Sequence, residues 1–153
     1  MDENTGTTIF DAFGSNDGTL MNGTAWAAGF LNSGLSFDGS NDYVSINGTD
    51  ITPPWTAALW VQRTGYKSTS ALLSSAAAAL KLEQYGSSNY QVGITRFGIA
   101  DYISNYTSPL NYWVHIAFVG TSSDTKLYVN GAYQYTFAAG INLPMLNMGC
   151  KES

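Results

Sequence analysis

Dense turn signals divide this chain into short segments and leave little room for helices. Five dipeptides tolerate positive φ and favour tight reversals: Asp17-Gly18, Asn22-Gly23, Asp38-Gly39, Asn47-Gly48 and Asn130-Gly131. Between them apolar and polar residues alternate. In the segment 55–62 the odd-numbered residues are apolar and Trp60 lies on the opposite face. The pattern predicts a chain of short β-strands.

Further strands are predicted at 43–46, 90–95, 113–119, 126–130 and 132–137. The segment 70–82 contains four consecutive alanines, and alanine favours helix. However, Leu80, Leu82 and Gln84 alternate with polar residues and no capping box precedes them, so strand or loop is favoured. Many short strands with Gly-rich turns indicate an all-β antiparallel sandwich, such as a jelly roll.

Composition narrows the class of protein. A chain of 153 residues with 44% hydrophobic and 14% aromatic residues suits a single domain, residues 1–153. A net charge of −5 with six basic residues cannot form a phosphate-neutralising stripe, so no nucleic-acid partner is expected. No apolar run approaches the roughly 20 residues that cross a bilayer, and the first residues are unlike a signal peptide. Membrane insertion is not expected.

Cys150 is the only cysteine, which excludes an internal disulfide and a metal site built on several thiolates. The cysteine count does not decide in which compartment the protein is located. The chain fits a module of a longer secreted protein, with Met1 supplied by cloning, and it fits an intracellular or viral product equally.

The residues that serve catalysis are scarce. His115, the only histidine, lies in the apolar alternation of 113–119 without a Gly-x-Ser-x-Gly elbow, so it is interpreted as a strand residue. Glycosidases need a pair of carboxylates, yet the glutamates are only Glu3, Glu83 and Glu152, two of them near the termini. The sequence therefore predicts no enzyme; the enzyme alternative would depend on Glu83.

The residues that bind sugars are better represented, because a sugar ring stacks on an aromatic side chain while its hydroxyls pair with polar groups. A hairpin turn or bend at Gly98 is expected to present Asp101 and Tyr102. The alternative is that the tyrosines cover the sheet and anchor loops, and that a loop covers Trp60. The candidate carbohydrate-binding residues are Trp60, Tyr85, Arg96, Asp101, Tyr102 and Tyr106.

Four stretches together resemble the laminin-G-like, concanavalin A-like lectin modules that are appended to carbohydrate-active enzymes. They are FDAFGSNDGTLMNGTAW, GLSFDGSNDYVSI, PWTAALWVQ, and the region from RFGIADY to LYVNG. The resemblance covers about residues 5–149 and implies a concanavalin A-like jelly roll. In that family one more strand follows a segment like 143–149, so this chain is expected to lack its closing C-terminal strand and to leave an edge unpaired.

The resemblance also implies a structural Ca²⁺ ion near the N-terminal loop. Ca²⁺ takes six to eight oxygen ligands, and Asp11 and Asp17 lie in the loop DAFGSND that supplies them. Asp38 and Asp42 form a second acidic loop, and they are expected to cap turns.

The function predicted is a non-catalytic carbohydrate-binding module that targets a partner enzyme or surface protein to a glycan. Its expected setting is extracellular or at the cell surface, within a longer protein, and its expected partners are a glycan and an attached catalytic domain or another subunit. The alternative is a virion or cell-surface adhesion domain that binds protein through the same sandwich.

Overall fold

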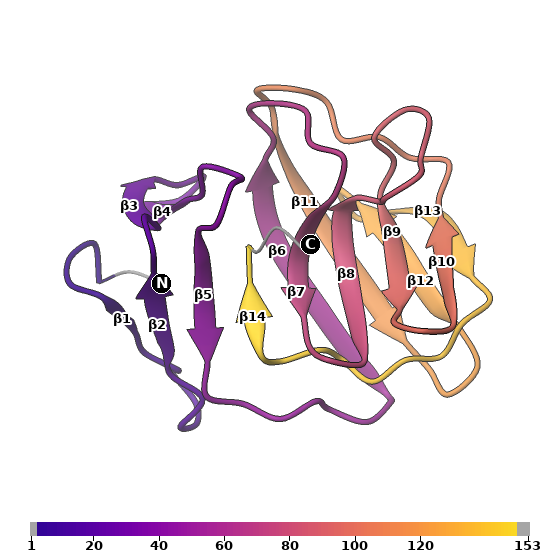
Figure 1. Cartoon of the computed structure of the whole chain (residues 1–153), viewed down its shortest axis with the longest axis horizontal. Helices are drawn as coiled ribbons and strands as arrows, with labels where there is room; N and C mark the ends of the chain where they lie inside the picture. Colours follow the sequence, from indigo (N-terminus) through magenta and orange to yellow (C-terminus); the bar gives the residue numbers. More distant parts are fainter. Residues whose placement is uncertain (1–2, 150–153) are drawn as a thin grey trace.

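The computed structural model describes residues 3–149 and contains two antiparallel β-sheets packed face to face (Figure 1). The order of the eight-stranded sheet is β1 (Thr8–Ile9), β2 (Gly18–Met21), β5 (Tyr43–Ile46), β14 (Asn147–Met148), β7 (Ser70–Ser74), β8 (Ala78–Glu83), β9 (Gly93–Arg96), β10 (Ala100–Ile103). The order of the four-stranded sheet is β13 (Ala132–Phe137), β12 (Thr125–Val129), β11 (Trp113–Gly120), β6 (Trp55–Gln62). A separate hairpin consists of β3 (Ala25–Ala28) and β4 (Ser33–Ser36). The predicted all-β sandwich is confirmed.

Residues 3–149 contain no helix of the length and apolarity that crossing a membrane requires.

The core follows from the alternation in β6 and β11, which pair along their whole length from Trp55↔Gly120 to Gln62↔Trp113. Successive side chains of a strand point to opposite faces, so one face of each strand turns inward. Ile116, Phe118 and Leu127 are fully buried between the sheets. The bounds predicted for β6 are confirmed, and β11 is one residue longer than predicted.

The Asn130-Gly131 turn joins β12 and β13, and both residues adopt positive φ, 50° and 81°. Two of the predicted turns are wrong. Asn47-Gly48 is irregular chain, and Gly18 begins β2. Gly18 is needed there for close packing, because a Cβ would lie 2.6 Å from Cγ1 of Val44.

The alanine-rich segment forms two strands, β7 and β8, as the alternation of its leucines indicates. Ala79 and Leu80 are fully buried. The ladder between the two strands is irregular: Lys81 pairs with Ala71 and Glu83 pairs with Ser70, so Leu82 has no partner in it. Such bulges re-aim the side chains that follow.

The C-terminal segment lies inside the large sheet. Asn147 pairs with Ser45 on one side and Ser74 on the other, so β14 joins β5 to β7 (Figure 1). No edge is left unpaired between β5 and β7 in the described sheet, and the absence of a further closing strand stays a prediction. Cys150 lies outside the described residues.

Candidate functional site

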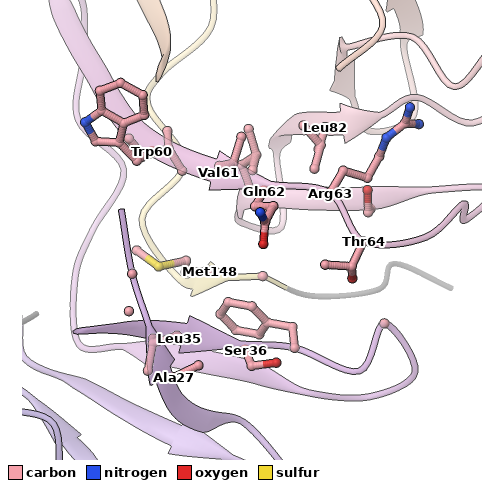
Figure 2. Close-up of a pocket in the computed structure, with 18 of the residues that line it drawn as sticks. Ala27, Leu35, Ser36, Trp60, Val61, Gln62, Arg63, Thr64, Leu82 and Met148 are labelled. Atoms are coloured by element: carbon pink, nitrogen blue, oxygen red, sulfur yellow. The ribbon is translucent and has the colours of Figure 1, made fainter. Parts of the chain in front are cut away.

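A cavity of about 740 Å³ opens beside the edge strand β6. One wall consists of the β3–β4 hairpin and residues 36–39, and the opposite wall consists of β6 and the connection that follows it. Figure 2 shows Gln62 pointing from β6 toward Leu35 and Ser36, with Met148 of β14 between the two walls. The cavity therefore forms where three segments that are distant in sequence meet.

Two stacked aromatic rings stand at this cavity. Phe30, in the turn between β3 and β4, lies over Trp60 of β6, with ring centroids 3.7 Å apart and planes 15° from parallel. Trp113 of β11 completes the group, 6.4 Å from Phe30. Phe30 and Trp60 remain 46% and 41% exposed, so both keep ring surface available to a ligand. The expectation that a loop covers Trp60 is therefore met only in part.

A buried ion pair lines the polar side of the cavity. Arg63, directly after β6, donates from Nη1 to Oε1 of Glu83 at 2.8 Å. Its Nη2 donates to the backbone oxygen of Ser108. Beside it Gln62 donates from Nε2 to the backbone oxygen of Asn111 at 3.2 Å and keeps its amide oxygen for a further donor. The polar groups here are held in place by the chain before any ligand binds.

Lys67 closes the cavity on the side of the 38–42 turn. Its backbone nitrogen donates to Oε2 of Glu83 at 3.0 Å, and its side chain lies against Gly39. The backbone N–H of Ser40 lowers the pKa of Asp38, and the ammonium of Lys67 lowers it slightly further. The connection between β6 and β7 thus contacts the turn before β5 through the side chain of Lys67 at Gly39.

The structure separates the predicted carbohydrate-binding residues. Trp60 lines the cavity, but the other five do not. Arg96 ends β9, Asp101 and Tyr102 lie in the edge strand β10, and Tyr85 and Tyr106 lie in neighbouring connections. In Figure 1, β9 and β10 lie at the end of the large sheet opposite β1 and β2. The six residues do not form one site.

The hairpin turn predicted at Gly98 is confirmed, with Gly98 at a φ of 73° between β9 and β10, but the turn does not present Asp101 and Tyr102 on one face. They are consecutive residues of a strand, so they point to opposite faces. Tyr102 packs against the core. Asp101 accepts a hydrogen bond from Oγ1 of Thr95 at 2.6 Å, and Thr95 in turn accepts one from Nε2 of Gln84 at 3.1 Å. Asp101 of β10 thus belongs to a hydrogen-bonded row that continues through Thr95 of β9 to Gln84, the residue directly after β8.

Tyr85 and Tyr106 differ in exposure. Tyr85 is 64% exposed, whereas Tyr106 packs against the core. Burial raises the pKa of the Tyr106 hydroxyl above its usual value, against smaller lowering effects from Ser108 and the charge of Arg63. Tyr106 is therefore held by packing, and the raised pKa of its hydroxyl makes its contribution to stability depend on pH.

Tyr106 should contribute to stability in a pH-dependent way. Because its folded pKa is raised, the folded state keeps the proton when the unfolded chain loses it, near pH 10. Stability is therefore complete below about pH 10 and falls as pH rises toward the folded pKa. We expect Tyr106→Phe to lose less stability than the parent chain between about pH 9 and 11, measured by urea unfolding. Tyr133→Phe, an exposed tyrosine, should behave like the parent; equal pH dependence in all three proteins would contradict the prediction.

Asp11 and Asp17 lie together in the N-terminal loop. Oδ1 of Asp17 accepts from the backbone nitrogen of Asp11 at 2.8 Å. Backbone donors, Phe13 first and then Asn16, lower the pKa of Asp11. No group of three or more His, Cys, Asp or Glu side chains within residues 3–149 is arranged to hold a metal ion. A Ca²⁺ ion here would have to draw most of its ligands from backbone oxygens, and the calcium site stays a prediction.

Asp42 and Glu83 serve the fold. Asp42 accepts from the backbone nitrogens of Gly23 and Asp38 at 2.8 and 2.9 Å, so the second acidic loop caps turns as expected. Glu83 is 1% exposed and accepts from Arg63, from Lys67 and from Oγ of Ser70.

His115 is a strand residue of β11, as the sequence predicts. Its ring stands edge-on to Trp60, with centroids 5.3 Å apart, and its backbone nitrogen donates to Oδ1 of Asn130.

Sequence reasoning missed Phe30, Gln62 and Arg63 as parts of a site. The odd–even alternation of β6 places Gln62 on the same face as Trp60, and that signal was available. Nothing local in the sequence indicates that Phe30 reaches Trp60, because the contact joins residues thirty positions apart.

A family model for the concanavalin A-like lectin/glucanases superfamily matches residues 38–147. Comparison with curated protein sequences finds no match. Among solved structures, the chain is similar to domain 4 of AbnA, a GH43 extracellular arabinanase from Geobacillus stearothermophilus, in complex with arabinotriose. The TM-score is 0.66 and the identity 16%, over 92% of this chain and 76% of that one. The carbohydrate-binding module CBM66 from Bacillus subtilis has a TM-score of 0.49 and 15% identity, over 86% of this chain and 83% of that one. The first likeness shows a shared fold.

Proposed function

Because the chain belongs to the concanavalin A-like lectin/glucanases superfamily, we propose that it is a carbohydrate-binding module without catalytic activity of its own. Such a module holds an attached enzyme or surface protein on a glycan, and its setting is outside the cell or at its surface. The similar arabinanase domain is in complex with arabinotriose, so this fold carries an oligosaccharide in that protein. That likeness supports the proposal at the level of the fold.

The observation that carries the proposal is the Phe30–Trp60 stack beside the amide of Gln62. The apolar face of a sugar ring packs on an aromatic ring, and its hydroxyls need fixed donors and acceptors at the edge. Trp60 offers the ring and Gln62 offers an amide oxygen within the same cavity. A glycan segment that enters the cavity therefore meets both kinds of contact at once.

The carboxylates at the cavity favour binding over hydrolysis. A glycosidase acid needs a raised pKa and access to the leaving oxygen. Glu83 is buried and its two oxygens accept from three groups of the chain. The pKa of Asp38 is lowered, which opposes the acid role. In the proposed function both residues therefore stabilise the walls of the cavity and take no part in catalysis.

The test is binding to immobilised polysaccharides, including arabinan, followed by calorimetry with soluble oligosaccharides in the presence and absence of Ca²⁺. We expect Trp60→Ala to weaken binding about tenfold or more, the equivalent of about 1.4 kcal/mol, because it removes the stacking surface. The matched control is Tyr133→Ala, an exposed aromatic on β13 at the far edge of the same sheet, which should leave the affinity unchanged. Absence of binding to every polysaccharide would overturn the proposal and leave protein adhesion as the alternative.

A further inference from the structure

A second pair of exposed aromatic rings lies at one end of the sandwich. Tyr66 belongs to the connection between β6 and β7, and Tyr90 belongs to the connection between β8 and β9. Their ring centroids are 4.5 Å apart and their planes differ by 37°. The rings are 55% and 39% exposed. Figure 1 shows that the two connections rise at the same end of the molecule.

The guanidinium of Arg63 makes cation–π contacts with both rings. Its Cζ lies 4.9 Å from the centroid of Tyr66 and 5.9 Å from that of Tyr90. Arg63 is itself buried and held by Glu83 and by the backbone oxygen of Ser108. Cation–π attraction therefore orients both rings without an entropy cost at the moment of binding.

Tyr90 is held in an unfavourable backbone conformation. Its φ is 55°, in the left-handed region that bulky residues rarely adopt. The connection around it is fixed by hydrogen bonds from Oγ1 of Thr107 to the backbone oxygen of Asn89 and from the backbone nitrogen of Gln91 to Oγ of Ser87. Strain of this kind persists where the surroundings impose it, and it is concentrated at functional sites.

The tyrosine pair adjoins the cavity. Arg63, Thr64, Gly65 and Lys67 all line the cavity, and Tyr66 lies between the last two. A chain that leaves the cavity along this connection meets the exposed rings directly. Two separate aromatic platforms are suited to different rings of one linear polymer, not to a single monosaccharide.

We propose that Tyr66 and Tyr90 form a second stacking subsite, so that the ligand is a linear oligosaccharide long enough to leave the cavity and reach them. This inference rests on the proposed function. It adds a chain-length requirement: short oligosaccharides fill the cavity at Trp60 alone, and longer ones gain affinity from the tyrosine pair.

The experiment titrates di- to octasaccharides of the best-binding linear polysaccharide into the whole chain by calorimetry. We expect affinity to rise about tenfold with length, a gain equivalent to about 1.4 kcal/mol. Tyr66→Ala and Tyr90→Asn should abolish the rise and leave disaccharide affinity unchanged. Asparagine tolerates the left-handed backbone at position 90, so that variant removes the ring and keeps the connection.

Two controls separate stacking from other effects. Tyr66→Phe keeps the ring and should keep the length-dependent gain. Tyr112→Ala removes an exposed tyrosine from the connection between β10 and β11 and should also keep it.

The outcomes distinguish this inference from the proposed function. Three results would overturn the second subsite alone. These are an affinity that does not rise with oligosaccharide length, a rise that survives Tyr66→Ala and Tyr90→Asn, and a loss of affinity in the variants that is the same at every length. Failure of the unmodified chain to bind any glycan would overturn both.

Discussion

Replacing Glu83 with glutamine should lower the free energy of unfolding by about 3–5 kcal/mol, the usual cost of breaking one side of a buried ion pair. Arg63 and Glu83 are 5% and 2% exposed in their side chains and lie 2.8 Å apart. Glutamine keeps the shape of Glu83 but leaves the guanidinium charge buried without a counterion. For a chain of this size the change corresponds to a fall of roughly 10 °C in Tm.

Urea unfolding of three proteins tests this prediction. The double variant Arg63→Met with Glu83→Leu removes both charges, so it should cost less than Glu83→Gln, although Lys67 and Ser70 lose an acceptor. A Glu83→Gln protein within about 1 kcal/mol of the parent would show that water reaches the pair and screens it.

Replacing Phe118 with alanine should be about as destabilising, by about 3–5 kcal/mol. Phe118 is fully buried in β11 within the cluster that fills the space between the sheets. Its removal deletes apolar surface and leaves a cavity that strands paired on both sides cannot collapse to fill.

The matched control is the next residue of the same strand. Val119 points to the opposite face and is half-buried, so Val119→Ala should cost about 1 kcal/mol. Urea unfolding midpoints with unchanged slopes measure both variants. Similar losses for Phe118→Ala and Val119→Ala would contradict the assignment of the inner face.

The sequence predicts those parts of the fold that depend on neighbouring residues. Strand β6 has its predicted bounds because alternation marks a half-buried strand over eight residues. The Asn130-Gly131 hairpin was predictable because both of its residues tolerate positive φ. The alanine-rich segment became two strands since burial against the core outweighs helix propensity.

The candidate site was less predictable, because its contacts join distant segments. Trp60 was identified as an aromatic on the outer face, but its partner Phe30 comes from a separate hairpin. No local pattern marks Tyr66 and Arg63 as parts of a site. Their arrangement depends on the connection between β8 and β9, which brings Tyr90 beside Tyr66. Asp101 and Tyr102 were grouped because they are adjacent in the sequence. Consecutive residues of a strand point to opposite faces of the sheet, so the two side chains are separated.

The two-residue strand β14 has a consequence for how the molecule opens. In the described sheet β5 and β7 are joined only through residues 146–149, so a seam with few amide hydrogen bonds crosses the large sheet. Seams of this kind separate cooperative unfolding units, whose local opening is easier than global unfolding. In Figure 1 the β3–β4 hairpin, whose turn carries Phe30, lies near β2 and β5, whereas β6, which carries Trp60, lies on the side of β7. A glycan that contacts both rings would bind only the closed state of the seam. Its binding free energy would therefore stabilise that state and slow amide exchange along the seam.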